Sequence, residues 1–297
     1  MGHLKYVLGP MRVPFLILTP ACVLLGLGTA IWSSGQIRTI HFIFVLVGAV
    51  SAHISVNAFN EYFDFRSGLD FRTSRTPFSG GSGTLPRSPA LAQQALHTAI
   101  AALAVTVLIG IYFLIVRGLL LLPLGIFGLL IIFAYTPWMA RNPFLCLIAP
   151  GLGFGPLMVM GTHFALTGVY SWTAFVASLV PFFLVNDLLL LNQFPDVDAD
   201  RSVGRRHFPI TIGRRASSWI YGAFLLFAML SIVFGVYMKF MPIWSLMGLV
   251  TVLIAVPAFI GAYRFAEDIN RLMPYMGLNV LINISMPVLV AIGLFVG

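Results

Sequence analysis

Charged side chains are scarce in this 297-residue chain: Asp, Glu, Lys and Arg make up 9% of the residues, whereas hydrophobic residues make up 59%. Soluble domains carry about 25% charged residues, so the composition excludes an ordinary soluble domain and indicates a membrane protein with several spans. Cysteine is scarce as well. Cys22 and Cys146 both lie in apolar stretches, which excludes a disulfide framework and a thiolate metal site.

Acidic residues are the rarest charged group, with 9 carboxylates against 17 basic side chains and a net charge of +8. Such a charge is also found in nucleic-acid-binding proteins. Here the basic residues lie in short connectors between apolar runs, a pattern typical of a topology signal in membrane proteins. We therefore predict a lipid bilayer and no nucleic acid as a partner. Nothing in the pattern requires a protein partner, and the six histidines have no metal-ligand spacing.

Long apolar runs are abundant, and nine of them are long enough to span a bilayer. They lie near residues 13–32, 41–60, 94–116, 119–138, 144–166, 172–191, 217–238, 243–263 and 275–296. We predict an all-α integral membrane protein whose nine transmembrane helices form a single domain over residues 1–297. The first run has no convincing cleavage site, so we interpret it as a retained helix and not as a signal peptide.

The basic residues are distributed unequally between the two sides of this nine-helix arrangement. Three lie on one side, Arg38, Arg117 and Lys239, and the other 14 lie on the opposite side: Lys5, Arg12, Arg66, Arg72, Arg75, Arg87, Arg141, Arg201, Arg205, Arg206, Arg214, Arg215, Arg264 and Arg271. Because cytoplasmic loops carry the excess of Lys and Arg, we predict a cytoplasmic N-terminus and a C-terminus outside, in the cell (inner) membrane.

Most of the acidic residues are gathered in two clusters that also contain asparagines. The first consists of Asn57, Asn60, Glu61, Asp64 and Asp70, and the second of Asn192, Asp196, Asp198 and Asp200. The first cluster ends the second predicted helix and the second cluster ends the sixth. Both clusters, and the loops that follow them, are therefore predicted to reach the cytoplasmic face.

The spacing within each cluster predicts a shared helix face. At about 100° per residue, the first four residues of the first cluster fall within about 100° of one another. By the same arithmetic Asn192, Asp196 and Asp200 share a face, whereas Asp198 points away. Carboxylates at i, i+3 or i+4 repel one another unless a cation lies between them, and oxygen ligands suit Mg²⁺. We therefore predict Mg²⁺, and through it a diphosphate, with the metal held by Asn60, Glu61, Asp64, Asp70, Asn192, Asp196 and Asp200. The alternative is a pair of solvated helix ends.

Each cluster is followed by a basic loop that contains glycine. The arginines of these loops that we consider for phosphate binding are Arg66, Arg72 and Arg75 in the first and Arg205 and Arg206 in the second. The planar fork of arginine donates pairs of hydrogen bonds to phosphate oxygens, so we predict that these residues, together with Asn57, bind the diphosphate. Alternatively, the arginines serve only topology and lipid headgroups.

The sixth and the last predicted spans each contain two strongly polar residues. Asn186 and Asp187 belong to the sixth span, and we interpret both as structural hydrogen-bonding residues; the alternative is a functional role, since ionisable residues within a membrane are candidates for one. Asn279 and Asn283, one turn apart in the last span, are interpreted as contacts between helices.

The pairing of Asn60-Glu61-x₂-Asp64-x₅-Asp70 with Asn192-x₃-Asp196-x₃-Asp200-x₃-Gly204-Arg205 resembles the UbiA superfamily of intramembrane aromatic prenyltransferases. The runs 62–70, 77–83 and 135–137 are similar to its menaquinone-pathway branch, which attaches a polyprenyl chain to 1,4-dihydroxy-2-naphthoate. Glu61 stands where the family usually has Asp, and 205–208 and 141–144 also depart from the branch pattern. Other acceptors therefore stay open: 4-hydroxybenzoate, homogentisate, another lipid or a tetrapyrrole.

The resemblance implies nine helices around a central cavity, and an enzyme that transfers a polyprenyl group from polyprenyl diphosphate to an aromatic acceptor. The implied catalytic residues are Asp64, Asp196 and Asp200, with the rings of Tyr62 and Tyr135 stabilising the allylic cation. A cation-coupled transporter is the alternative from another class, although its acidic residues would be expected at the membrane midplane. A phosphatidyl-transfer enzyme would need an Asp-Gly-x₂-Ala-Arg run, which the chain lacks.

Overall fold

The computed structural model describes residues 8–297, and every regular element in that part of the chain is helical. Lys5, one of the residues used to predict topology, lies outside it. The long helices are α2 (Leu18–Ser34), α3 (Thr39–Ser67), α5 (Ala92–Arg117), α6 (Leu122–Ala134), α9 (Trp172–Asn192), α12 (Arg214–Tyr237), α13 (Val252–Arg264) and α14 (Ile269–Val296). The shorter helices are α4 (Thr84–Arg87), α7 (Pro143–Leu152), α8 (Gly161–Thr167), α10 (Val197–Ser202) and α11 (Phe208–Thr211).

Each of the nine predicted spans forms a helix. Within the described residues, eight helical segments are long and apolar enough to cross a membrane, and the predicted span 119–138 corresponds to the shorter apolar helix Leu119–Ala134. The all-α membrane fold is confirmed. The helix that carries the first acidic cluster continues to Ser67, beyond the predicted end at residue 60, so Asn60, Glu61 and Asp64 belong to one uninterrupted helix.

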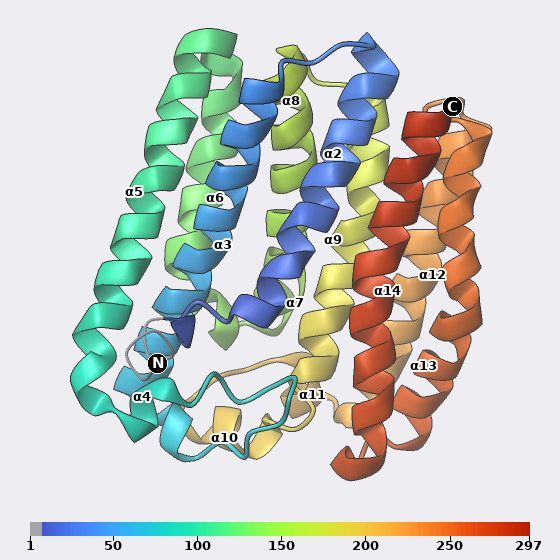
Figure 1. The fold of residues 1–297 in the computed structure, drawn as a ribbon. Helices are drawn as coiled ribbons and strands as arrows, with labels where there is room; N and C mark the ends of the chain where they lie inside the picture. The colour runs from blue at the N-terminus through green and yellow to red at the C-terminus, as the bar shows by residue number, and fades with distance from the viewer. Residues whose placement is uncertain (1–7) are drawn as a thin grey trace.

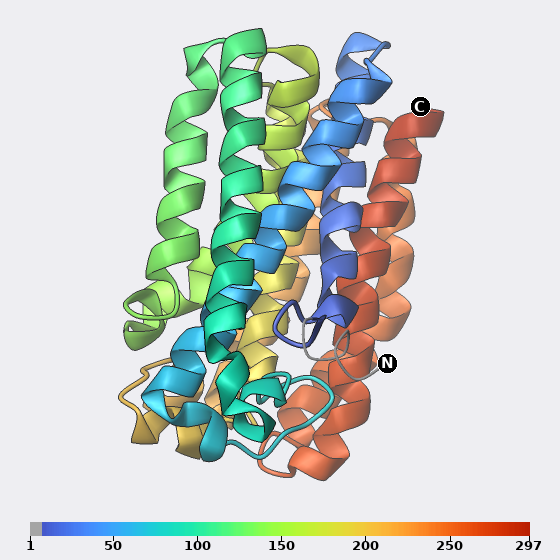
Figure 2. The same cartoon turned by 60° about the vertical axis from the view of Figure 1, so that its left-hand side comes forward.

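The helices run side by side in two groups with α2 and α9 between them (Figure 1). One group contains α3, α5 and α6, and the other contains α12, α13 and α14. The turned view in Figure 2 shows the same near-parallel bundle from another side. The short helices α4, α10 and α11 gather at one end of the bundle, and the C-terminus lies at the opposite end. We call the end with the short helices the connector end.

The segment Pro143–Thr167 crosses the bundle as three pieces, α7, a π-helical stretch (Gly153–Met160) and α8. Two glycines let it approach α9 closely: a Cβ on Gly151 would lie 2.2 Å from the Phe182 carbonyl oxygen, and one on Gly155 would lie 2.5 Å from that of Ser178. Small residues one turn apart are typical of tight helix contacts in membranes. The backbone N–H of Gly151 donates to Asn186 Oδ1 at 2.6 Å, which confirms the structural role predicted for Asn186.

The other three intramembrane residues named above differ in their contacts. Asn283 donates only to the backbone oxygen and Oδ1 of Asn279 on its own helix, at 3.0 and 3.2 Å, so the prediction that it hydrogen-bonds between helices is wrong for this structure. Asn279 on α14 donates to the backbone oxygen of Asp187 on α9 at 3.4 Å, so its predicted role between helices is confirmed. The Asp187 carboxylate is fully buried, and neither of its oxygens has a hydrogen-bond partner among residues 8–297. The prediction that its side chain is a hydrogen-bonding residue is therefore wrong for this structure, because only its backbone is used.

Candidate functional site

A polar cavity lies at the connector end, between the last turns of α3 and α9 and the loops that follow them. Its free volume is about 110 Å³, below the roughly 300–1,000 Å³ of typical ligand pockets. Residues predicted for the site from both acidic clusters and from the segment after α6 line it: Asn60, Asp64, Asp70, Tyr135, Asn192, Asp196, Asp200 and Arg205. Asp64 and Arg205, which are 141 residues apart in sequence, thus meet in one cavity.

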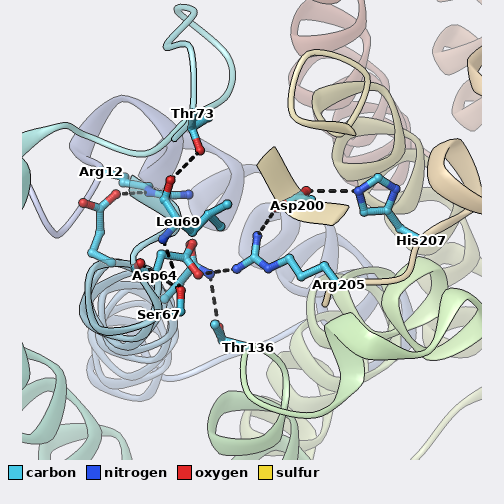
Figure 3. Close-up of polar contacts among 11 residues, drawn as sticks. Arg12, Asp64, Ser67, Leu69, Thr73, Thr136, Asp200, Arg205 and His207 are labelled. Atoms are coloured by element: carbon cyan, nitrogen blue, oxygen red, sulfur yellow. Dashed lines mark hydrogen bonds and ion pairs between the residues drawn. The ribbon is translucent and has the colours of Figure 1, made fainter. Parts of the chain in front are cut away.

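Arg205 joins the two acidic clusters. Its Nη1 donates to Asp200 Oδ1 at 3.0 Å, and its Nη2 forms an ion pair with Asp64 Oδ1. Figure 3 shows its guanidinium lying between the two carboxylates. The other oxygen of Asp200 lies 3.0 Å from Nε2 of His207. Both oxygens of Asp200 therefore have partners, and its side chain is held in one orientation.

Glu61 has a different set of partners. Its Oε1 accepts from Nε of Arg12 and from the backbone N–H of Ser82, each at 2.7 Å, and its Oε2 accepts from the Ser82 hydroxyl at 2.8 Å. The side chain is fully buried and does not line the cavity. In this structure Glu61 ties two loops to α3, namely the segment before α2 and the loop that precedes α4.

The loop over residues 73–83 covers the cavity from the side of the first cluster. Thr76 Oγ1 accepts from the backbone N–H groups of Phe78 and Ser79 at 3.1 and 2.9 Å, which fixes a tight turn. Gly81 then has φ +70°, and a Cβ there would lie 3.1 Å from Glu61 Oε1 and 3.2 Å from Asp70 Oδ1. Glycine is therefore required for the backbone to pass this close to the carboxylates.

Seven predicted site residues do not line the cavity. Asn57 donates to the Met11 carbonyl at 3.0 Å, and the ring of Tyr62 packs edge-on against Phe63 with centroids 5.6 Å apart. Arg72 donates to the Ser202 hydroxyl at 3.1 Å on the outer surface. The others are Glu61, described above, and the exposed Arg66, Arg75 and Arg206. Apart from Arg205, the arginines nearest the acidic motifs in sequence thus do not line the cavity.

The second cluster does not lie on one continuous helix, so the helical phase used to predict its shared face is wrong between Asn192 and Asp196. Helix α9 ends at Asn192, four turn residues follow, and α10 begins at Val197. Pro195 has no N–H to continue the backbone ladder of α9. Asp196 and Asp200 keep helical spacing, because Asp200 N–H donates to the Asp196 carbonyl at 2.8 Å. All three still line the cavity, and the Asp198 side chain is 87% exposed, as predicted.

Sequence reasoning did not assign a site role to several residues that line the cavity, notably Arg12, Cys146, Gln193 and His207. Arg12 lies 49 positions before its partner Glu61, and its backbone has a left-handed conformation with φ 50°. No local pattern links these positions. His207 follows the second motif directly, so the proximity of an imidazole to Asp200 was a usable signal.

The electrostatic environment separates the carboxylates of the site. Burial, with a smaller contribution from the charges of Glu61 and Asp64, raises the pKa of Asp70 to about 7. Burial and the neighbouring Asp200 likewise raise the pKa of Asp196 to about 7. Burial also acts on Asp200, but the hydrogen bond from His207 and the charge of Arg205 outweigh it and lower the pKa of Asp200. Asp70 and Asp196 are therefore the carboxylates with the greatest need of a cation.

The donor set fits a hard divalent cation such as Mg²⁺. Asp70 Oδ2 and Asp196 Oδ1 are buried and have no hydrogen-bond partner in the described part of the chain, and the adjacent Asn60 and Asn192 provide amide oxygens. Within residues 8–297 no three His, Cys, Asp or Glu side chains are arranged to hold a metal ion. The types of donor therefore suit Mg²⁺, and the carboxylates must draw closer together to hold the ion.

The chain is similar to known proteins both in sequence and in fold. Residues 19–274 match the UbiA prenyltransferase family. The chain belongs to this family. A UbiA homologue from Aeropyrum pernix K1 superposes with a TM-score of 0.71 at 18% identity, over 95% of this chain and 98% of that one. A UbiA homologue from Archaeoglobus fulgidus bound to DMAPP and Mg²⁺ gives a TM-score of 0.60 at 14% identity, over 97% and 99% of the two chains.

One curated protein similar to this UbiA family member is 1,4-dihydroxy-2-naphthoate octaprenyltransferase of Bacillus subtilis (strain 168). The two are 27% identical over 185 residues, which is 61% of this chain and 58% of the relative. The chain therefore matches less than two thirds of the relative's length. Membership of the family, together with the apolar helices, makes this a multi-pass membrane protein.

Proposed function

We propose that this protein transfers a polyprenyl group from polyprenyl diphosphate to an aromatic acceptor, in a reaction that depends on Mg²⁺. The observation that carries the proposal is the meeting of both acidic motifs in one cavity beside Arg205 and Arg12. The UbiA family match and the DMAPP and Mg²⁺ of the Archaeoglobus homologue support it.

We assign the metal to Asn60, Asp64, Asp70, Asn192, Asp196 and Asp200, the oxygen donors that line the cavity. A Mg²⁺ ion held by these residues would supply the positive charge that neutralises the diphosphate leaving group, which otherwise faces a cavity rich in carboxylates. We do not retain Glu61 as a ligand, because its oxygens are engaged by Arg12 and Ser82.

The side chains of the chain itself have three tasks in this proposal. Arg12 and Arg205 supply N–H donors toward the diphosphate oxygens. Tyr135, which lines the same cavity, presents a ring to the allylic cation. The enclosing helices and the loop over residues 73–83 exclude the water that would quench that cation.

The aromatic acceptor that we propose is 1,4-dihydroxy-2-naphthoate, on the basis of the Bacillus relative. The test is incubation of purified protein in lipid with Mg²⁺, prenyl diphosphates of several lengths and a panel of aromatic acids, with products identified by mass spectrometry. We expect a prenylated naphthalene product with the naphthoate. Product from 4-hydroxybenzoate or homogentisate alone would replace the acceptor and leave the reaction type intact. Cation uptake without any prenyl transfer would favour the transporter and refute the proposal.

We also propose that the connector end faces the cytoplasm of the cell membrane. Most Lys and Arg residues lie at that end, whereas Arg38, Arg117 and Lys239 lie at the other. In a background without native cysteine, Ser74→Cys and Ser202→Cys are both expected to react with an impermeant thiol reagent only from the cytoplasmic side. Labelling of the two positions from opposite sides would contradict a single cavity.

A further inference from the structure

One guanidinium holds two of the carboxylates that we assign to the metal. Arg205 is bonded through Nη1 to Asp200 and through Nη2 to Asp64, one oxygen of each carboxylate. The three side chains are largely buried, with 19% of Arg205, 8% of Asp64 and 4% of Asp200 exposed. Few water molecules reach this bridge, so its charges interact strongly.

The same oxygens cannot serve the guanidinium and Mg²⁺ in one geometry. A guanidinium reaches the two carboxylates through different nitrogens, each of which lies about 2.8 Å from its acceptor oxygen. Mg²⁺ instead draws its oxygen ligands to about 2.1 Å from a single centre. The bridge therefore keeps Asp64 on α3 and Asp200 on α10 farther apart than a shared metal ion requires, and this agrees with the lack of a ready three-residue metal group within residues 8–297.

The backbone around Arg205 favours movement of its side chain alone. The N–H of Arg205 donates to the Asp200 carbonyl at 3.1 Å, and the N–H of Arg206 donates to the Ala140 carbonyl at 3.0 Å. These bonds fix the main chain on both sides of the Arg205 Cα. Its side chain lines a cavity of only about 110 Å³, so a diphosphate that enters this space lies close to the guanidinium.

On the basis of the proposed function, we propose that Arg205 is a built-in competitor of Mg²⁺. It neutralises Asp64 and Asp200 while the metal is absent, and it transfers its N–H donors to the diphosphate oxygens when the metal and the prenyl diphosphate enter together. Free Mg²⁺ then binds weakly, and binding of the metal and binding of the diphosphate reinforce each other.

The test is Mn²⁺ binding, followed by electron paramagnetic resonance, to the purified full-length protein with and without inorganic diphosphate. Arg205→Gln is expected to bind Mn²⁺ alone at least tenfold more tightly than the wild type, and to bind diphosphate in the presence of Mn²⁺ at least tenfold more weakly. The matched control is Arg72→Gln, which removes the same charge near the same loops but only a surface contact to Ser202. It is expected to stay within about twofold of the wild type.

Unchanged or weaker Mn²⁺ binding by folded Arg205→Gln would overturn the inference, since the bridge would then only hold α3 and α10 together. If Arg205→Gln does not fold, Arg205→Lys decides the question. Lysine is a point charge without the two-nitrogen fork, so it cannot bridge Asp64 and Asp200 in the same way. The Arg205→Lys variant should therefore still bind Mn²⁺ more tightly than the wild type. If the wild type binds no Mn²⁺ even with diphosphate, the proposed function itself is refuted. If Mn²⁺ and diphosphate reinforce each other's binding to the same extent in the wild type and in Arg205→Gln, only the competition is refuted.

Discussion

The two acidic clusters reach the same cavity by different structural means. Asn60 and Asp64 lie one turn apart on α3, which is helical without interruption to Ser67. Asn192 ends α9, and Asp196 follows only after a turn that contains Pro195. A regular helix therefore orients Asn60 and Asp64 of the first cluster, with Asp70 in the 3-10 turn that follows it, whereas a turn between two helices orients the second. Helical spacing is informative for the first cluster and within α10, and it fails across the turn.

The clusters also differ in how their charges are neutralised. Glu61 of the first cluster is fully engaged by Arg12 and Ser82, while Asp200 of the second is held by Arg205 and His207. Asp70 and Asp196 each retain a buried oxygen without a partner among the described residues. Each cluster therefore combines a carboxylate that is fully paired within the protein, Glu61 or Asp200, with one that keeps an unpaired oxygen for a cation, Asp70 or Asp196.

The largest effect is expected from removing one cavity carboxylate in either cluster. Asp64→Asn and Asp196→Asn should each lower the rate of prenyl transfer by at least about 10²–10³-fold, because each removes charge stabilisation of the leaving group. Asp198→Asn is the matched control, since its side chain is 87% exposed only two positions from Asp196; we expect less than a twofold change. Rates are measured on protein that elutes as a single folded species, and equal losses at Asp196 and Asp198 would contradict the placement of the second cluster.

A change at Glu61 tests whether the first cluster contains an anchor as well as ligands. Glu61→Gln leaves Arg12 without its ion-pair partner, so we expect the free energy of unfolding to fall by about 1–3 kcal/mol and the loop over residues 73–83 to be cleaved faster by protease. Activity should fall less than in Asp64→Asn. Arg66→Gln, an exposed change on the same helix, is the control for stability. If Glu61→Gln instead lost as much Mn²⁺ affinity as Asp64→Asn and kept its stability, Glu61 would be a metal ligand and not an anchor.

The smallest of these effects concerns pH and compares Asp70 with Asp196. The pKa of each is raised to about 7, so protons compete with the metal below that pH. Mg²⁺ affinity should therefore rise between pH 6 and pH 8, by about tenfold for each carboxylate that must lose its proton. The same shift makes the folded protein bind protons more tightly than the unfolded chain, so its stability should fall as pH rises from about 4 to about 7. Isothermal titration calorimetry in two buffers measures the protons released. A Mg²⁺ affinity that did not change with pH would contradict the prediction that Asp70 and Asp196 must lose protons before they bind the ion.

The fold was largely predictable from the sequence because apolar runs of spanning length are a strong signal. Eight of the runs became helical segments long enough to span, and the ninth became the shorter Leu119–Ala134. The first cluster was predictable for a related reason, since helical spacing alone places Asn60 and Asp64 together. In the second cluster a turn that contains Pro195 interrupts the helical spacing. The end of α9 at Asn192 was therefore not predicted by spacing alone.

The remaining parts of the site depend on contacts between distant segments. Arg12 reaches Glu61 from a residue in the left-handed conformation, which no apolar or helical pattern indicates. Arg72 was predicted to bind diphosphate because of its place in a motif, but tertiary structure turns it to the surface against Ser202. Sequence proximity identified the correct loops. Packing decided that Arg205 of the second loop lines the cavity and that Arg66, Arg72 and Arg75 of the first loop do not.

The central claim is that both clusters form one site in which Mg²⁺ joins the carboxylates to a diphosphate. Like charges about 4–6 Å apart without the ion would cost a few kcal/mol even at an effective dielectric constant of about 20. The direct measurement is the affinity of the purified protein for a non-hydrolysable prenyl diphosphate analogue, first with Mg²⁺ and then with EDTA. We predict tight binding that disappears on chelation. Tight binding that survives EDTA would mean that arginines alone hold the diphosphate, and would contradict the assignment of Asp64, Asp70, Asp196 and Asp200 to the metal.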